Sequence, residues 1–243
     1  MYHPSQRSDM ENPGAIISDT SPARVPDSRR LTGQHVTLKR MTESDLPGLW
    51  SAVGSHAEVF TYWPGGPYGD LSQFADSLRQ ISVDEPDVVV YTVFKRKEAL
   101  GCLFLLPTDL KNRVMEIGAL YGPALQKSRE ATEAIYLGAR LAFDELNNRR
   151  LAWKTSSINQ PSQRAAERLG FTFEGRLRQH GIQKGRNRDT MWYSIIDSEW
   201  PLCKRAFELW LEDGNFDEQE NQRQRLDDIR RWVASGEHVP AEE

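Results

Sequence analysis

The feature that most constrains the fold is the order of the predicted elements in the middle of the chain. Three strand-like stretches follow one another: VVVYTVF (Val88–Phe94), ALGCLFLLP (Ala99–Pro107) and VMEIGALYG (Val114–Gly122). The short polar turns between them, KRKE and TDLKN, predict an antiparallel meander. A long apolar helix is expected next, roughly from Arg129 to Leu146, because apolar residues recur there at helical spacing. This order indicates a mixed fold in which an antiparallel sheet is covered by helices.

The stretches on either side of this core extend the same domain to about residues 31–200. HVTLKR alternates like a strand, Thr42 is a candidate N-cap, and Asp70 can cap a helix over residues 71–82. After the long helix, RLAWKTSS predicts a strand, and NQPSQRAAERLG predicts a short helix that Gly170 ends. FTFEGRLRQ and TMWYSIID, joined by the turn QKGRNRD, predict a closing hairpin.

The two ends of the chain differ from this domain in composition. Residues 1–30 are polar, rich in Pro and Ser, and lack the apolar centre of a signal peptide, so we expect a mobile arm. Residues 201–243 carry two apolar stripes at helical spacing in an otherwise acidic extension: Cys203, Phe207, Trp210 and Leu211, then Leu226, Ile229, Trp232 and Val233. Two interpretations stay open, a helical cap packed on the domain and a partner-binding arm.

Charge and cysteine content exclude several classes of protein. A net charge of −4 and the lack of a recognition motif argue against a nucleic-acid binder. No apolar run approaches the ~20 residues that cross a bilayer, so no membrane contact is expected. The five His and two Cys residues form no metal-ligand spacing, and no metal is expected. Cys102 and Cys203 are expected to be buried free thiols of a cytoplasmic protein, with one disulfide as the alternative.

Four stretches, taken in order, resemble the GNAT N-acetyltransferase superfamily, in particular its RimJ/RimL-like branch. They are EIGALYGPALQKSREATEA, RRLAWKTSSINQPSQRAAERLGF, FEGRLRQHGIQKGRNRDTMWYSI and the closing DSEWP. The succession N-x-x-S, A-x-x-L-G-F, E-G-x-L-R and G-x-x-R-D is specific, whereas each piece alone is weak. The resemblance implies a GNAT fold, an α/β (α+β) fold with a splayed, mostly antiparallel mixed sheet flanked by helices. It also implies an enzyme that uses acetyl-CoA as co-substrate.

The resemblance implies that pantetheine lies between the strand ending near Tyr121 and the strand at Leu151–Thr155, with the pyrophosphate on the start of the long helix. The family loop [Q/R]-x-x-G-x-[G/A] falls on Gln126 to Ala131, where Arg129 replaces the glycine. A helix start leaves about four N–H groups unpaired and can hold an anion without glycine if the backbone stays helical. The Arg129 guanidinium and the Thr132 hydroxyl are candidate additional contacts.

The alternative for this stretch is that Ser128 merely caps a core helix and Arg129 is solvated. The full set of candidate cofactor residues is Leu120, Tyr121, Gln126, Lys127, Ser128, Arg129, Glu130, Ala131, Thr132, Asn159 and Ser162.

The catalytic candidates follow from the N-x-x-S element and from the need for a neutral amine. In resembling proteins the Asn (here Asn159) anchors the pantetheine or acetyl region, and the Ser (here Ser162) approaches the thioester sulfur, where a hydroxyl can protonate a leaving thiolate. Asn159 can equally be an ordinary N-cap. Ala166 stands where many GNATs carry a Tyr acid, which gives Ser162 more weight. The base candidates are Glu116, Glu174, His180 and Asp189, with Glu116 and Glu174 preferred.

For the acceptor side, the loop TYWPGGPYGD offers Tyr62, Trp63 and Tyr68 as substrate-binding residues beside His180, although these aromatics can also simply pack a helix crossover. The predicted function is N-acetylation of a primary amine by direct attack, in a small molecule by preference or at a protein N-terminus. The alternative is a non-catalytic module that binds CoA or a protein. The protein is expected to be a monomer or a homodimer.

Overall fold

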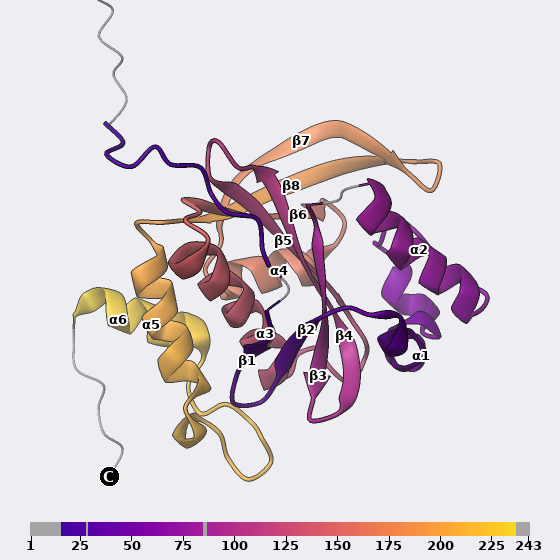
Figure 1. Ribbon diagram of the computed structural model, residues 1–243. Coiled ribbons are helices and arrows are strands. Elements are labelled where there is room, and N and C mark those ends of the chain that lie inside the picture. The colour runs from indigo at the N-terminus through magenta and orange to yellow at the C-terminus, as the bar shows by residue number, and fades with distance from the viewer. Residues whose placement is uncertain (1–15, 28, 85–86, 237–243) are drawn as a thin grey trace, which may run out of the picture.

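The computed structural model describes residues 16–27, 29–84 and 87–236. Over these residues a single sheet of eight strands runs through the molecule in the order β1-β2-β3-β4-β5-β6-β8-β7 (Figure 1). Neighbouring strands are antiparallel except β5 and β6, which are parallel. The strands are β1 Leu31–Thr32, β2 Thr37–Arg40, β3 Val89–Lys95, β4 Glu98–Asp109, β5 Val114–Tyr121, β6 Arg150–Ser156, β7 Thr172–Gln183 and β8 Arg186–Ile196. The predicted mixed, mostly antiparallel sheet is confirmed.

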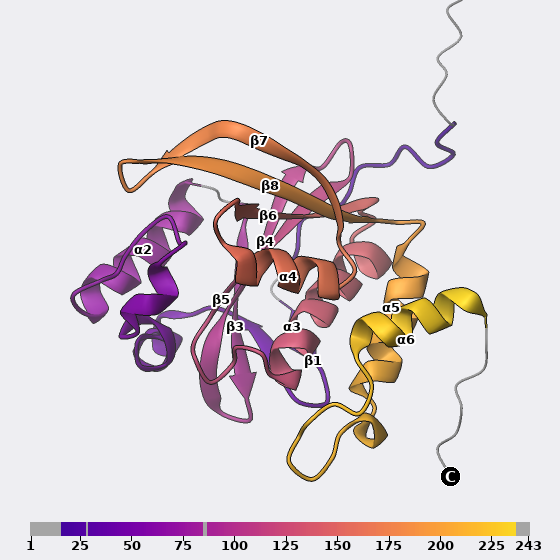
Figure 2. The ribbon, with the colours of Figure 1, turned by 180° about the vertical axis from the view of Figure 1, so that it is seen from behind.

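Helices cover both faces of this sheet. One face carries α3 and α4 with the C-terminal α5 and α6, and the opposite face carries α1 and α2 (Figures 1 and 2). The α-helices are α1 Leu46–Leu49, α2 Leu71–Asp84, α3 Arg129–Arg140, α4 Gln160–Arg168, α5 Trp200–Leu211 and α6 Leu226–Ser235. Shorter helical turns are η1 Glu43–Asp45, η2 Trp50–Gly54, η3 Ala57–Phe60, η4 Leu141–Glu145 and η5 Asp213–Asn215.

The predicted helix ends agree closely with the observed caps. Thr42 forms a capping box with Asp45, and Asp70 Oδ1 accepts the Gln73 N–H at 2.9 Å at the start of α2. Gly170 follows α4 with a φ of 99°, a left-handed backbone that glycine adopts without strain. The predicted long helix changes character near its end, because α3 continues into the wider π-helical turn η4.

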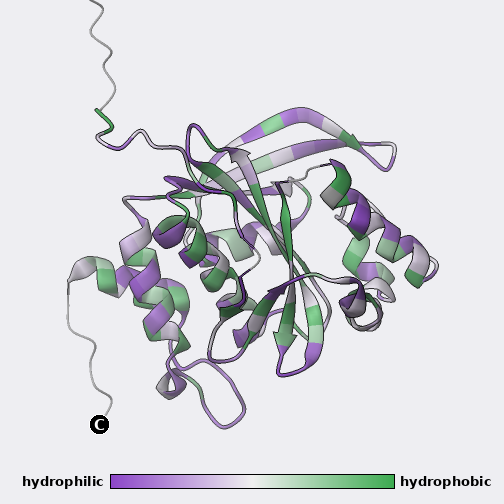
Figure 3. Cartoon of the chain, viewed as in Figure 1, coloured by the Kyte–Doolittle hydropathy of each residue, from purple (hydrophilic) through white to green (hydrophobic). Residues whose placement is uncertain are grey.

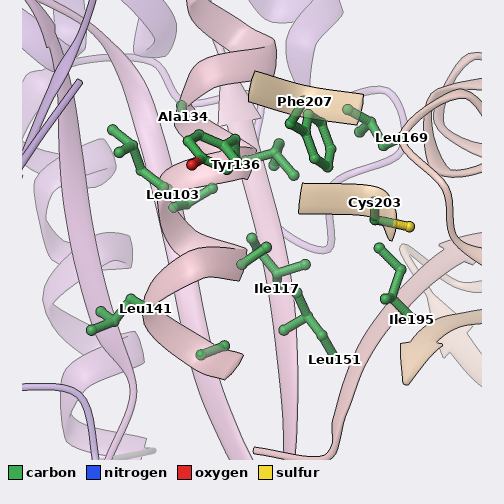
Figure 4. Packing of buried hydrophobic residues seen from close by; sticks show 14 of the residues in the cluster. Leu103, Ile117, Ala134, Tyr136, Leu141, Leu151, Leu169, Ile195, Cys203 and Phe207 are labelled. Atoms are coloured by element: carbon green, nitrogen blue, oxygen red, sulfur yellow. The ribbon is translucent and has the colours of Figure 1, made fainter. Parts of the chain in front are cut away.

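Two apolar clusters, one on each face, hold the layers together. The larger joins the sheet to α3 and to the C-terminal helices, where Ile117, Tyr136, Ile195 and Phe207 lie close together (Figure 4). The smaller joins β3–β5 to α1 and α2 around Phe60, Phe74 and Phe104. The hydrophobic centre of the sheet and the mixed polarity of the outer helices are seen in Figure 3. Burial of apolar side chains on both faces explains why the central strands are nearly continuous apolar runs.

Both chain ends pack on the central domain over the residues that the structure describes, more closely than their composition predicts. Residues 19–27 lie along the domain: the Ala23 N–H donates to Leu110 O at 2.8 Å, and the Tyr91 hydroxyl donates to Asp27 O at 3.1 Å. The mobile arm predicted over residues 1–30 is therefore wrong for this part, and the first fifteen residues lie outside the described ones. The C-terminal extension packs on the domain, with Phe207, Trp210 and Ile229 in the larger cluster. This arrangement favours the helical-cap interpretation.

Candidate functional site

The site begins where β5 and β6 separate. These parallel strands pair at only three positions, and the last pair is Glu116 with Ala152. Beyond it the edge of β5 is not covered by β6, although β5 still pairs with β4 as far as Tyr121. The two strands therefore part, and each has a backbone edge that the other does not pair with, which is the splayed sheet that the resemblance implies.

The backbone groups that face this opening follow from the β4–β5 ladder. Gly122 N–H donates to Leu100 O at 3.1 Å, so this pair is of the hydrogen-bonded kind. In an antiparallel ladder such pairs alternate, which directs the Leu120 N–H to β4 and the N–H groups of Ala119 and Tyr121 to the open side. The N–H of Leu120, one of the predicted cofactor residues, thus points into the sheet, and the N–H of Ala119 faces the open side beside that of Tyr121.

The N-terminus of α3 lies at the end of the loop that follows β5. Ser128 is its N-cap, and the Ser128 side chain accepts the Ala131 N–H at 3.0 Å. Arg129 is the first helical residue, and the left-handed residue of the loop is Lys127, with a φ of 61°. Glycine is therefore not required at the position of Arg129. The N–H groups of Lys127 and Arg129 have no hydrogen-bond acceptor among the described residues, so the loop fits an anion through its backbone.

The Arg129 side chain turns away from that loop toward the C-terminal extension. Its guanidinium donates to Leu211 O and, at 2.9 Å, to Asp213 Oδ1, and it lies 4.1 Å from the ring centroid of Phe216. Only 11% of this side chain is exposed. The predicted contact between the Arg129 guanidinium and a phosphate is therefore not the arrangement found, and the solvated alternative is wrong as well.

Other polar side chains of the loop and of the first turn are also bonded within the protein. Thr132 is buried, donates to Ser128 O at 3.4 Å and accepts from Arg168 at 3.1 Å. Glu130 is paired with Lys95 at 2.5 Å, and Gln126 Nε2 donates to Tyr121 O at 3.0 Å. These side chains shape the loop and present its backbone, rather than offering free polar groups to a ligand.

Asn159 and Ser162 stand at the start of α4, directly after β6. Asn159 Oδ1 accepts the Ser162 N–H at 3.2 Å, so Asn159 is the N-cap of α4. Ser162 Oγ accepts a hydrogen bond from Trp153 Nε1 at 3.0 Å. Because Oγ is the acceptor in that bond, the Ser162 proton remains available for donation to a further group.

Glu116 and Lys154 form an ion pair at the point where the strands part. Lys154 Nζ lies 2.6 Å from Glu116 Oε2, and both side chains are largely buried. The same ammonium lies 4.4 Å from the ring centroid of Trp192. Glu116 belongs to the face of β5 that carries Leu120 of the smaller cluster, so the pair lies on the side of α1 and α2. A carboxylate is present at the opening, and it is held by a cation.

The other two carboxylates considered as bases bond elsewhere. Glu174 pairs with Arg150 at the first residue of β6 and accepts from Ser194 Oγ at 2.7 Å. Glu116 instead lies opposite Ala152 in the β5–β6 register and pairs with Lys154, so the two carboxylates are held by different cations. Hydrogen bonds, chiefly from Arg150, lower the pKa of Glu174. Asp189 accepts from Gln179 N–H, Asn187 and Arg176, and these bonds lower its pKa to about 2.

The β7–β8 hairpin brings His180 over the same face. A bulge between Leu177 and Gly181 interrupts the pairing of β7 with β8, and His180 Nδ1 lies 3.0 Å from Thr190 Oγ1. The hairpin tip reaches the loop before α2, where Lys184 Nζ donates to Phe60 O at 2.7 Å and Gln183 Nε2 to Tyr62 O at 3.0 Å (Figure 1). The hairpin thus bridges from the sheet to the aromatic loop.

Within that loop the three predicted substrate residues have different surroundings. Trp63 packs against Phe104 in a tilted arrangement at 5.3 Å, and Tyr68 meets Phe60 edge-on at 5.1 Å between ring centroids, so both pack on the smaller cluster. The Tyr62 side chain is more exposed, at 36%. The packing alternative therefore describes Trp63 and Tyr68 well, and Tyr62 is the residue of the three whose side chain is most open to a ligand.

A comparison with known proteins identifies the family. Residues 35–172 match the model of the acetyltransferase (GNAT) domain, which is more than half of the chain. The chain belongs to the GNAT acetyltransferase family. It is an acetyl-CoA-dependent acyltransferase with a GNAT fold.

Solved and curated GNAT relatives support the assignment. A GCN5-related N-acetyltransferase from Brucella melitensis is 34% identical with a TM-score of 0.84, and the match covers 88% of this chain and 100% of that one. Residues 1–200 are a smaller share of the 243 residues, so the match extends into the C-terminal extension. A Bacillus subtilis protein, provisionally named as a ribosomal N-acetyltransferase, is 31% identical over 41% of this chain and 55% of its own length.

A more distant structure shares the GNAT fold. Spermidine N-acetyltransferase from Vibrio cholerae, solved with CoA and spermine, is 19% identical with a TM-score of 0.58 over 70% of this chain and 99% of that one. The described residues of this GNAT protein hold no cluster of three or more metal-ligating side chains, and none of its described helices is long and apolar enough to cross a membrane.

Several residues of this GNAT site escaped the sequence analysis. Lys154, Trp192 and Thr190 line the face of Glu116, and Trp153 bonds to Ser162. Strand alternation could have found part of this set, since Lys154 lies directly opposite Trp192 in the β6–β8 register. Nothing in the sequence predicts that the Trp153 indole reaches Ser162, because that contact depends on how α4 packs against β6.

Proposed function

We propose that this protein transfers the acetyl group of acetyl-CoA to a primary amine by direct attack of the amine on the thioester, as a member of the RimJ/RimL-like branch. The observation that carries the proposal is the opening between β5 and β6 beyond Glu116 and Ala152, with Ser162 and the N-terminus of α3 beside it. The spermidine enzyme of the same fold binds CoA, which supports the same use of the opening here.

The CoA portion would be bound mostly by backbone. The N–H groups of Lys127 and Arg129 would hold the pyrophosphate, and those of Ala119 and Tyr121 would pair with the pantetheine or the thioester oxygen. Asn159 would keep Ser162 in place as the N-cap of α4. In this arrangement acetyl-CoA is a co-substrate, and no metal takes part in the proposal.

The reaction needs one proton removed and one supplied. The neutral amine attacks the carbonyl carbon, which gives an oxyanion that the Tyr121 or Ala119 N–H can stabilise, and the attacking nitrogen then loses its extra proton. The C–S bond then breaks, and the Ser162 hydroxyl donates a proton to the departing thiolate while the Trp153 N–H holds its oxygen. Glu116 is the carboxylate nearest the opening and would take the amine proton, directly or through water, with Lys154 beside it.

The acceptor is proposed to be a small molecule. The hairpin tip bonds to the loop before α2, and an acceptor side bounded by this contact would suit a compact amine better than a folded protein surface. The Bacillus subtilis relative keeps a protein N-terminus as a second candidate.

Calorimetric titration with acetyl-CoA, followed by thiol release over a panel of amines, tests this function. We expect saturable binding and amine-dependent release of CoA. Binding without release on any amine, including short peptides with a free N-terminus, would favour a non-catalytic module. Absence of acetyl-CoA binding would refute both.

A further inference from the structure

Strand β8 presents three polar side chains in a row toward the acceptor side. Arg188, Thr190 and Trp192 alternate with Met191, Tyr193 and Ile195, which pack into the larger cluster on the opposite face. Trp192 lies directly opposite Lys154 in the β6–β8 register, and its ring touches the Lys154 ammonium that pairs with Glu116. Together, Glu116, Lys154, Trp192, Thr190 and Arg188 form one continuous surface, which we call the acceptor wall.

Two of these side chains hold buried donors that have no acceptor. Trp192 Nε1 and Arg188 Nε are inaccessible to solvent and form no hydrogen bond with any described residue. Arg188 is held through another atom, since its Nη1 donates to Thr190 Oγ1 at 2.9 Å. A buried donor without a partner costs stability, and most such groups in proteins are satisfied. Both donors would be satisfied by a group that only accepts.

The distribution of charged side chains on the same wall also favours binding of an anion. The Glu116 carboxylate is already paired with Lys154. Arg188, in contrast, has no carboxylate within ion-pair distance among the described residues, and neither does Lys184 at the hairpin tip. The nearest acidic residue of β8, Asp189, points to the other face and is paired with Arg176. The wall thus carries uncompensated positive charge at Arg188.

We propose that the acceptor amine carries an anionic group, a carboxylate or a phosphate, which Arg188 and the Trp192 indole N–H bind while the amine lies near Glu116. This inference rests on the proposed amine acetylation and names its substrate class. A guanidinium and a neighbouring N–H donor suit the oxygens of either anion. The same charge disfavours polycationic acceptors of the kind seen with the spermidine enzyme.

Matched pairs of amines test the proposal by turnover. β-Alanine and its amide differ in a carboxylate, and phosphoethanolamine and ethanolamine differ in a phosphate, so the two pairs also separate the two anions. We expect kcat/KM to favour the anionic member of one pair by roughly 10- to 100-fold. Arg188→Gln should abolish most of that preference, whereas Arg186→Gln, at the exposed start of β8, should keep it. Equal or better use of the neutral members or of spermidine would overturn the proposal.

A readout that does not need turnover separates this proposal from the proposed function. The indole N–H resonance that disappears in Trp192→Phe is assigned to Trp192, one of seven tryptophans. With CoA present, an anionic amine should shift this resonance in the wild type and much less in Arg188→Gln, while its neutral partner should not. No shift with any anionic member would refute the anion site. A shift without acetylation would leave the anion site standing and refute amine acetylation.

Discussion

The two sides of the β5–β6 opening differ in the groups that they offer to a ligand: backbone N–H groups on the CoA side and side chains on the acceptor side. At the start of α3, the side chains of Arg129, Glu130 and Thr132 are bonded to the protein itself, and the open groups are backbone N–H groups. On the acceptor side, the wall is made of side chains from β5, β6 and β8, with Glu116, Lys154 and Trp192 in contact. Substitutions should therefore affect the first side through stability and the second side through specificity.

Ser162 should be the main exception to this division, and Ser162→Ala should have the largest effect on turnover. It lies on the CoA side yet acts through its side chain, since the hydroxyl would protonate the leaving thiolate. Loss of a general acid typically costs 10²–10⁴-fold, so we expect kcat to fall by about 100-fold with little change in acetyl-CoA affinity. Steady-state kinetics and calorimetry measure the two quantities.

The control for this variant is Ser77→Ala on α2, whose hydroxyl donates only to Phe74 O. Melting curves are also needed, because removal of Ser162 Oγ leaves Trp153 Nε1 without its acceptor. A normal kcat in Ser162→Ala would show that water, and not Ser162, protonates the leaving thiolate. The CoA side would then act through backbone groups alone.

Arg129→Ala should give the largest loss of stability without loss of cofactor affinity. The guanidinium joins α3 to the extension through Leu211 O, Asp213 and the Phe216 ring. Loss of these contacts should lower the free energy of unfolding by about 2–3 kcal/mol. Urea denaturation measures this effect, and Arg205→Ala, an exposed position on α5, is the matched control. A marked drop in acetyl-CoA affinity in the folded variant would instead show that the Arg129 side chain contributes to phosphate binding.

Local sequence patterns predict the elements of this fold better than they predict the partners of its long side chains. Elements whose identity depends on local pattern were predicted well: the meander β3–β5, the N-cap Asn159 and the stop at Gly170 all agree with the structure. The partners of long side chains were not predicted. Arg129 and Asp213 are 84 residues apart in the chain, and only the docking of the extension brings them together.

The candidate site divides in the same way. Glu116 is the last residue of β5 that pairs with β6, and Ser162 lies in the first turn of α4 directly after β6, because strand position and motif fix these places. Glu174 bonds to Arg150, and Lys154 was missed, since the separation of β5 from β6 decides which charged residues meet. Loop aromatics were ambiguous for a similar reason: the ring contacts depend on how the loop packs on Phe104 of β4 for Trp63 and on Phe74 of α2 for Tyr68.

Asp189→Asn should change acceptor recognition and leave the CoA side unaffected. Asp189 holds the bulge of β7 by accepting from Gln179 N–H, Asn187 and Arg176, and that bulge carries His180 over Thr190. An amide cannot accept all these bonds, so His180 should shift and the acceptor KM should rise about 10-fold, with acetyl-CoA affinity retained. Because the pKa of Asp189 is lowered to about 2, the wild-type bulge should persist throughout the working pH range.

The control is Asp197→Asn, a carboxylate just past the end of β8 whose contact with Arg113 is long, at 3.8 Å. If Asp189→Asn reduced acetyl-CoA affinity as strongly as acceptor use, the two sides would not be independent. Chemical shifts of the His180 ring in the two variants would show whether the bulge had moved.

Glu174→Gln should have the smallest effect, on stability alone. Hydrogen bonds from Arg150 lower the pKa of Glu174 in the folded state, so the pair stabilises the fold above the ordinary glutamate value of about 4.3. The stabilisation is lost as the pH falls through the lower folded value. The pair is partly exposed, so the variant should lose at most about 1 kcal/mol at neutral pH, and the difference from wild type should vanish in acid. Kinetics should show unchanged kcat, with Glu98→Gln as an exposed control. A large drop in kcat would make Glu174 the base and would place part of the acceptor chemistry at the Arg150–Glu174 pair instead of the Glu116–Lys154 pair.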